Sequence, residues 1–134
     1  MDNLSKLKRS LCMSRIRSKN TIPERTVKGI LRKLRIKAKY HTENLPGKPD
    51  IAIPKKKLVV FINGCFWHQH KNCKRAVMPK TNINYWKNKL KRNIYLQRKQ
   101  VSALKRLGWK VKIVWECQTK DSTKLTRRIK QFIK

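Results

Sequence analysis

The chain has 134 residues, of which 37 are Lys or Arg and only six are Asp or Glu, so its formal net charge is +31. This length allows one domain with one core. A hydrophobic fraction of 39%, with apolar runs at 58–62 and 111–115, excludes a disordered basic tail. Such a charge is tolerated when the usual partner is a polyanion. Nucleic acid is favoured over a membrane surface because many cations can displace counterions from phosphates, although a general lysine bias also contributes.

Targeting signals are not apparent in the sequence. It contains no apolar stretch of about 18 residues that could span a bilayer, and its basic N-terminus lacks the apolar segment of a signal peptide. We therefore expect a cytoplasmic, nucleoid-associated protein. In that reducing compartment, four cysteines favour metal binding or free thiols over disulfides.

The first half of the chain is expected to form an arm, a helix and a group of strands. Residues 1–20 are basic without periodicity and predict an N-terminal arm, whereas 21–134 predict a single domain. A capping-box pattern at 21–24 starts a helix expected over about 22–37. Strands are expected at 39–43, 51–53 and 58–63, with a turn-rich loop at 45–49.

The second half is expected to add a loop, two helices and one strand. Residues 64–80 have no regular pattern and contain Cys, His and aromatic residues. Thr81 is expected to cap a long helix through about Leu107, with Gly108 just after its end. A strand at 109–117 and a C-terminal helix follow. The order α-β-β-β-α-β-α predicts an α/β fold with a mixed central sheet flanked by helices.

Asp50 stands apart among the six carboxylates. It follows Gly-Lys-Pro and leads directly into an apolar strand, so its carboxylate would be held on a rigid scaffold at the sheet edge, as a metal site requires. A turn-capping Asp is an equally good interpretation of the position alone. Glu24, in the first turn of a helix, is explained by capping alone.

A group of thiols and imidazoles at 65–73 predicts a zinc site. Cys65, Cys73 and Cys117 can provide three of the four ligands that tetrahedral zinc requires, and either His68 or His70 can provide the fourth. Spacing does not decide between the two histidines. A cluster of buried thiols without metal is the alternative, but His is uncommon beside core cysteines.

Several aromatic residues lie among the cations. Phe66 and Trp67 either seal the zinc loop against the sheet or wedge into a base stack, which would kink DNA. Trp86 begins the long helix. Trp109 and Trp115 are expected in the core because they alternate with apolar residues on a strand.

Together these segments resemble the very short patch repair (Vsr) endonucleases. The resemblance covers roughly residues 13–119 and includes, in family order, MSRI at 13–16, Glu24, LPGKPD at 45–50, GCFWH at 64–68, PKT at 79–81, WKNK at 86–89, Asn93, LGW at 107–109 and VWEC at 114–117. The pairing of a Pro-Gly-Lys-Pro-Asp loop with Gly-Cys-Phe-Trp-His is far more specific than a zinc spacing by itself.

The resemblance implies a restriction-endonuclease-like fold with a structural zinc loop, and it also implies a specific nuclease activity. Such enzymes hydrolyse the phosphodiester 5′ of the thymine in a T:G mismatch. It implies that Asp50 and the carbonyl of Ile62 bind catalytic Mg²⁺, that His68 is the general base, and that Glu24 assists through metal-bound water. The structural zinc ligands would be Cys65, His70, Cys73 and Cys117. The DNA contacts would be Met13 and Ile16 on the arm, the aromatic wedge of Phe66, Trp67 and Trp86, and also Lys89 and Asn93.

Two departures from the family pattern qualify these roles. Ile62 and Asn63 stand where the best-known form has a Thr-His pair, and Asn63 cannot transfer a proton as an imidazole does, although it can hydrogen-bond a leaving oxygen or a metal-bound water. Residues 71–72 form a short insertion in the zinc loop.

Two alternative functions remain. The chain could be a restriction-type nuclease without mismatch preference, or a zinc-stabilised DNA-binding module without catalysis. Partners expected from the family are double-stranded DNA with a T:G mismatch and MutL- and MutS-type repair proteins, with the chain acting as a monomer.

Overall fold

The computed structural model describes residues 21–134, so the arm at 1–20, with Met13 and Ile16, lies outside the described residues. The helices and strands are, in order, α2 (Ile22–Lys33), β1 (Lys39–Tyr40), β2 (Ile51–Ile53), β3 (Leu58–Asn63), α3 (Ile83–Arg106), β4 (Lys110–Trp115) and α4 (Ser122–Phe132). Short 3-10 helices occupy Pro54–Lys56, Lys74–Ala76 and Glu116–Lys120. This order and the mixed sheet are as predicted.

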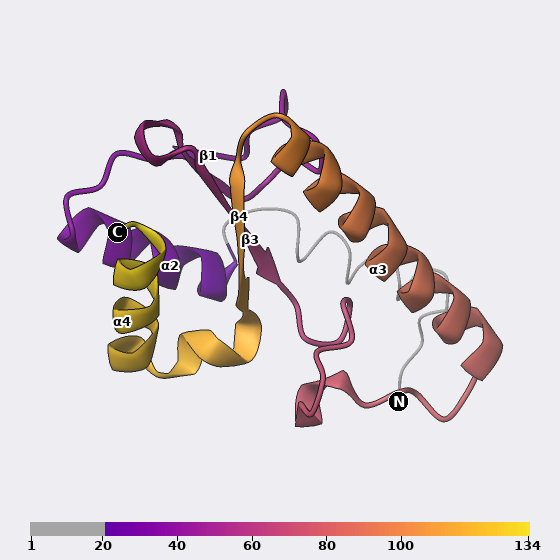
Figure 1. Ribbon diagram of the computed structural model, residues 1–134. Helices are drawn as coiled ribbons and strands as arrows, with labels where there is room; N and C mark the ends of the chain where they lie inside the picture. Colours follow the sequence, from indigo (N-terminus) through magenta and orange to yellow (C-terminus); the bar gives the residue numbers. More distant parts are fainter. Residues whose placement is uncertain (1–20) are drawn as a thin grey trace.

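The four strands form one sheet in the order β1-β2-β3-β4. The first two pairs are antiparallel, and β3 and β4 are parallel. Helices α2 and α4 lie on one side of the sheet and α3 lies on the other (Figure 1). The start of β2 and the carboxyl ends of β3 and β4 therefore meet at one edge of the sheet, and this edge carries the candidate site.

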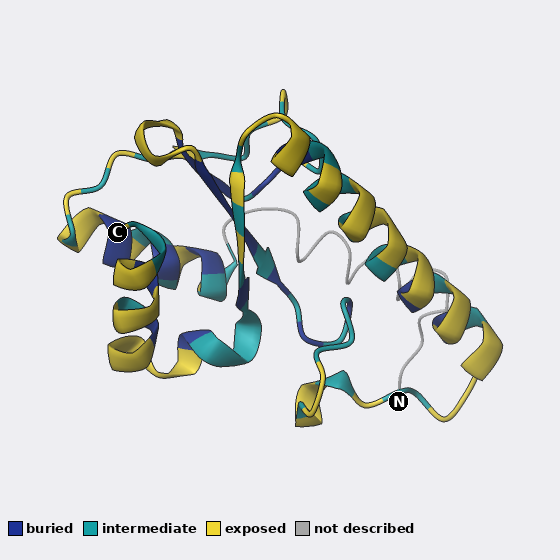
Figure 2. Cartoon of the chain, in the orientation of Figure 1, coloured by how far each residue is buried: buried dark blue, intermediate teal, exposed yellow. Residues whose placement is uncertain are grey.

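The central strand β3 is covered on both faces. Leu58 and Val60 belong to the apolar cluster that α2 and α4 complete. Val59 and Phe61 point the other way and pack with Leu104 of α3. An apolar run without polar alternation is typical of a strand buried on both sides, and the strands are the most buried part of the chain (Figure 2).

Two elements of the first half end earlier than expected, and both ends follow from backbone conformation. Thr21 caps α2, since its side chain accepts a hydrogen bond from the Glu24 N–H at 3.3 Å. The helix stops at Lys33 rather than at residue 37 because Arg35 takes a left-handed conformation, with φ of 57°. Strand β1 stops at Tyr40 because His41 is also left-handed, with φ of 54°.

The second half contains two further corrections. Thr81 does not cap α3: the cap position is Asn82, and no side chain bonds the first turn there. Gly108 follows the helix with φ of 90°, as predicted for a terminating glycine. Strand β4 ends at Trp115, two residues before the expected end. The Trp115 N–H donates to Gln118 Oε1 at 3.0 Å, which turns the chain into a 3-10 helix.

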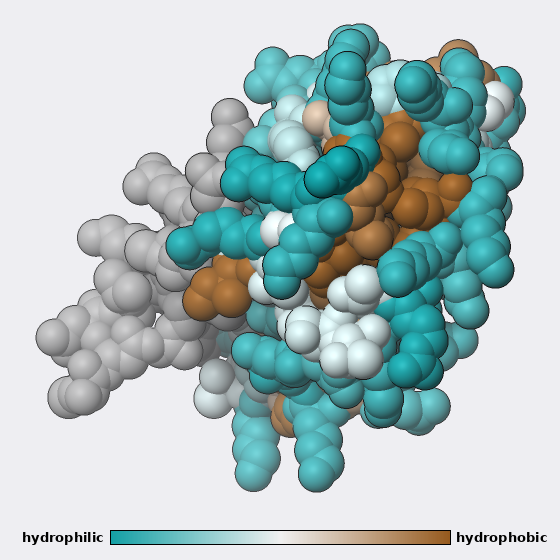
Figure 3. Space-filling view, turned by 90° about the vertical axis from the view of Figure 1, so that its left-hand side faces the viewer, coloured by the Kyte–Doolittle hydropathy of each residue, from teal (hydrophilic) through white to brown (hydrophobic). Residues whose placement is uncertain are grey.

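The surface of the described part is dominated by hydrophilic side chains. On the face seen from the side of α2 and α4 they surround a large apolar area, and smaller apolar areas lie apart from it (Figure 3). No helix within residues 21–134 is long and apolar enough to cross a membrane.

Candidate active site and metal centre

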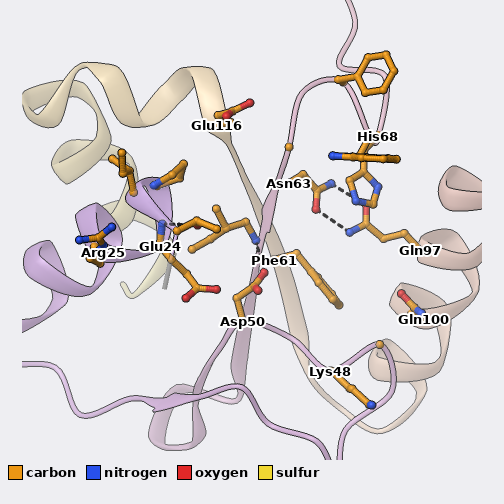
Figure 4. Close-up of a pocket in the computed structure, with 18 of the residues that line it drawn as sticks. Glu24, Arg25, Lys48, Asp50, Phe61, Asn63, His68, Gln97, Gln100 and Glu116 are labelled. Atoms are coloured by element: carbon orange, nitrogen blue, oxygen red, sulfur yellow. Dashed lines mark hydrogen bonds between the residues drawn. The ribbon is translucent and has the colours of Figure 1, made fainter. Parts of the chain in front are cut away.

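A cavity of about 680 Å³ opens at the edge where β2 begins and β3 ends. The polar side chains around it come from α2, from the start of β2, from the end of β3 and the loop after it, from α3, and from the turn after β4. They include Glu24, Asp50, Asn63, His68, Gln97 and Glu116. Glu24 and Asp50 lie on one side of the cavity, and Asn63, His68 and Gln97 lie on the other (Figure 4).

Asp50 is held by the strand beside it. Pairing between β2 and β3 ends at Ile51 and Val60, so the Ile62 N–H has no partner in β2. This N–H donates instead to Asp50 Oδ2 at 2.7 Å. Backbone N–H and C=O groups of one strand residue point the same way, so the Ile62 carbonyl faces the Asp50 side of the strand as well. A carboxylate and a carbonyl in this arrangement suit a hard divalent cation.

Burial raises the pKa of Asp50 to about 6. The hydrogen bond from Ile62 and the charge of His41 act in the opposite direction, whereas the neighbouring Glu24 carboxyl raises the pKa further. Two carboxyl groups at one buried site disfavour each other's ionisation. A divalent cation would relieve that repulsion, so the site fits one.

Glu24 does more than begin α2. Its backbone N–H is part of the helix cap, but the residue is 2% exposed, and capping does not require burial. Ligand atoms of Glu24, His41 and Asp50 all lie within 4.8 Å of one another, a geometry that could hold a metal ion. The place of Glu24 in the first turn of a helix therefore suggested capping alone, whereas the family resemblance pointed to a role in the site.

His41 is a site residue that the sequence analysis missed. No local pattern indicated it, because its place depends on strand register: β1 and β2 pair Tyr40 with Ile51, and the next pair in that register is His41 with Asp50. The His41 N–H accordingly donates to the Asp50 carbonyl at 3.1 Å. The sequence pattern indicated only the two histidines of the zinc loop as ligands.

Asn63 and Gln97 form a closed amide pair on the other side of the cavity. Asn63 Nδ2 donates to Gln97 Oε1 at 2.7 Å, and Gln97 Nε2 donates to Asn63 Oδ1 at 2.8 Å. Asn63 is 2% exposed, so these two bonds fix the orientation of its amide. Gln97 was not predicted, and no local pattern indicated it, because the pairing joins β3 to α3 across 34 residues.

The cysteines and one histidine come together at the same sheet edge. The parallel register of β3 and β4 pairs Asn63 with Trp115, which sets Cys65 opposite Cys117 two residues later. His70 Nδ1 lies 3.8 Å from Cys65 Sγ and 3.4 Å from Cys117 Sγ. Sulfur and nitrogen ligands of tetrahedral zinc stand about 3.5 Å apart. With Cys73 these residues form a Cys₃His cluster that could hold a metal, and His68 is not part of it.

The protonation of the cluster is uneven. Burial raises the pKa of the Cys65 thiol to about 12, whereas a hydrogen bond from the Arg75 backbone lowers the pKa of Cys73. A metal must therefore displace a proton from Cys65 in order to bind.

The His70 ring is stacked on Trp115, with a ring-centroid distance of 4.1 Å and an interplanar angle of 10°, which holds the imidazole in place. Trp115 is thus half-buried at the cluster rather than in the core, while Trp109 packs at the edge of the α3-side core.

The aromatic residues form a third cluster beside the cavity. Trp67 and Trp86 are each 6% exposed and pack with Leu90, while Phe66 is half-buried, with its ring centroid 5.5 Å from both indoles. Asn93 Nδ2 donates to the Trp67 carbonyl at 3.3 Å. Phe66 and Trp67 therefore seal the loop against α3, not against the sheet as expected. The wedge into a base stack stays a prediction.

Comparison with known proteins identifies the family of this chain. A family model described as DNA mismatch endonuclease Vsr matches residues 1–75. The type II nicking enzyme V.XorIIP of Xanthomonas oryzae pv. oryzae is 37% identical over 132 residues, which cover 98% of this chain and 96% of that protein. The DNA mismatch endonuclease Vsr of Escherichia coli is 35% identical over 121 residues, which cover 90% of this chain and 77% of that protein.

The fold has a solved counterpart as well. The catalytic domain of the homing endonuclease I-Bth0305I superposes with a TM-score of 0.56 at 23% identity, over 84% of this chain and 94% of that one. This likeness supports the nuclease fold, and the sequence relatives support the activity. The chain belongs to the Vsr family and is a DNA endonuclease.

Proposed function

We propose that this endonuclease nicks one DNA strand 5′ of the thymine in a T:G mismatch. The observation that carries the proposal is the placement of Glu24 and Asp50 across one cavity from His68, beside a packed aromatic cluster in a chain of charge +31. The names of the relatives, a mismatch endonuclease and nicking enzymes, support cleavage of one strand at a mismatch.

Asp50 and the Ile62 carbonyl would hold catalytic Mg²⁺, with Glu24 reached through metal-bound water. When bound, the cation neutralises charge that builds on the phosphate and makes a bound water more acidic. The Ile62 N–H keeps one Asp50 oxygen in place, which would leave the other oxygen available to a cation. Burial of Glu24 and Asp50 strengthens their interaction with the cation, because the local dielectric is low.

His68 would accept the proton of the attacking water. It lines the cavity opposite the carboxylates, and a neutral imidazole suits this task near neutral pH. Asn63 would hydrogen-bond a leaving oxygen or a water. Its amide has one N–H and one lone pair left after pairing with Gln97.

The aromatic cluster would provide mismatch selectivity. Phe66, Trp67 and Trp86 would act as a wedge in the major groove, while Lys89 and Asn93 contact the DNA near the mismatch. Unstacking costs a few kcal/mol per step and costs least at a mismatch. Lys89 Nζ lies 5.5 Å from the centre of the Trp67 ring, so a phosphate-binding cation stands directly beside the wedge.

The Cys₃His cluster would hold one structural Zn²⁺. Four protein ligands leave no open position, which is typical of structural rather than catalytic zinc. Zinc would join the loop after β3 to the turn after β4 and so make rigid the segment that carries Phe66 and Trp67.

The test is a nicking assay on two matched duplexes that differ only in a T:G or a C:G pair, with Mg²⁺ and the full chain. We expect one strand of the T:G duplex to be cut 5′ of the thymine, with little cutting of the C:G duplex. Equal cutting of both would replace the proposal with a restriction-type nuclease. Binding of T:G DNA without a nick under any divalent metal would replace it with a DNA-binding module.

A further inference from the structure

The side chain of His41 approaches the carboxylates from a second direction. Its Nε2 lies 3.3 Å from Glu24 Oε2, and both side chains are largely buried. His41 is not among the residues that line the cavity, so its imidazole reaches Glu24 and Asp50 from behind the cavity wall. Three ligand atoms of two kinds, carboxylate oxygen and imidazole nitrogen, therefore converge on one point.

Nε2 of His41 is buried and, among residues 21–134, has no hydrogen bond of good geometry. A buried nitrogen of this kind calls for a partner. Two ligands at about 2.1 Å from an octahedral cation stand about 3.0 Å apart, close to the 3.3 Å between Nε2 and Glu24 Oε2. The distance fits an ion pair between the two groups as well as a cation shared by them, and the absence of hydrogen-bond geometry at Nε2 among the described residues favours the shared cation.

The backbone holds His41 in this position. The residue is in the left-handed conformation, which ordinary side chains rarely adopt. It is kept there by the bond from its N–H to the Asp50 carbonyl at 3.1 Å, and by Thr42, whose hydroxyl donates to the Pro49 carbonyl at 3.2 Å. Sites where backbone strain is maintained are often functional.

We propose that His41 Nε2 and Glu24 are both direct ligands of the divalent cation at Asp50, which replaces the water-mediated role of Glu24 given above, and that this nitrogen makes the centre bind Mn²⁺ in preference to Mg²⁺. Imidazole suits transition-metal cations, whereas Mg²⁺ prefers oxygen ligands and keeps much of its water. The inference depends on the proposed function only in assigning a divalent cation to Asp50.

The first experiment measures cation affinity by calorimetry and by the loss of the free Mn²⁺ signal in electron paramagnetic resonance. The full chain, zinc included, is compared with His41→Gln and, as a matched control, with His68→Gln. We expect His41→Gln to weaken Mn²⁺ binding by about tenfold or more, with a change of less than about threefold for Mg²⁺. The control should leave both affinities within about twofold. Unchanged Mn²⁺ binding, or an equal loss for both cations, would overturn the inference.

The second experiment needs no substitution at His41, so it decides the matter even where that variant fails to fold. Pulsed electron paramagnetic resonance of Mn²⁺ bound to the parent chain should show coupling to a histidine nitrogen, and ¹⁵N-histidine labelling should change that coupling. The coupling should persist in His68→Gln. Absence of the coupling in the parent, or its loss in His68→Gln, would contradict a His41 ligand.

Failure of the inference and failure of the proposed function give different results. A chain that nicks the T:G duplex with Mg²⁺ but shows no nitrogen coupling retains the function without the His41 ligand. A chain that shows the coupling but does not nick retains the ligand without the function.

Discussion

The Cys₃His cluster and the Glu24–His41–Asp50 cluster lie at the same edge of one sheet and differ in almost every chemical respect. The first consists of soft thiols with one imidazole and lies around a loop. The second has two carboxylates and one imidazole; Glu24 lies in the first turn of α2, Asp50 stands directly before β2, and both acids border a cavity of about 680 Å³. The comparison teaches that ligand type and access, rather than the mere presence of ligands, separate a site that stabilises a loop from a site that can act on a substrate.

The largest effect is expected at the carboxylate cluster. Asp50→Asn keeps the side-chain size but removes the charge that holds a cation, so nicking of T:G DNA should fall roughly 10³-fold. Binding of the same duplex, measured by fluorescence anisotropy in Ca²⁺, should change little because phosphate contacts dominate affinity. Retained nicking would show that Asp50 is not part of the catalytic centre, and the two clusters would then not differ in function as described.

At the Cys₃His cluster, substitutions should lower the stability of the fold and not only the activity. Cys117→Ser should lower the free energy of unfolding by about 3 kcal/mol, because a structural metal contributes to folding directly. Metal analysis should find about one zinc per parent chain. Cys12→Ser, outside the described residues, is the matched control and should change stability by less than about 0.5 kcal/mol. Similar melting of the two variants would mean that the cluster holds no structural metal.

The carboxylate cluster should also destabilise the fold in a pH-dependent way when no Mg²⁺ is present. The folded-state pKa of Asp50, about 6, is above its ordinary value of 3.8. Protonated Asp50 therefore stabilises the fold fully below about pH 4, and this contribution is lost as the pH rises through 6. Asp50→Asn should be about as stable as the parent at pH 4 and about 3 kcal/mol more stable at pH 8.

Urea unfolding at both pH values measures this difference. Added Mg²⁺ should narrow it at pH 8 by stabilising only the parent. A variant less stable than the parent at pH 8 would show that the Asp50 carboxylate is not strained by its surroundings.

The smallest effect is expected at the amide pair on the far side of the cavity. Gln97→Ala leaves the buried Asn63 amide without its two bonds and should cost about 1–2 kcal/mol of stability. Gln100→Ala, on the same helix and beside the same cavity, should cost less than about 0.5 kcal/mol. Thermal unfolding of the two variants checks the difference. Equal losses of stability would mean that the Asn63–Gln97 amide pair does not stabilise the fold.

Sequence patterns determined the elements and much of the site. Runs of apolar residues predicted β3 and β4, and the capping box predicted the start of α2, because these signals are local. Asp50 could be singled out since it stands directly before a strand. Cys65 and Cys117 could be linked because each follows a strand of the sheet. The family resemblance added the choice of His70 over His68.

Only the tertiary structure decided the remaining members of the site. The place of His41 beside Asp50 depends on the exact register of β1 and β2 and on the left-handed conformation of His41 itself, which ends β1. Gln97 depends on how α3 packs across the sheet. Element lengths and helix caps can be read from nearby residues, but contacts between distant segments depend on packing and register, which no local pattern specifies.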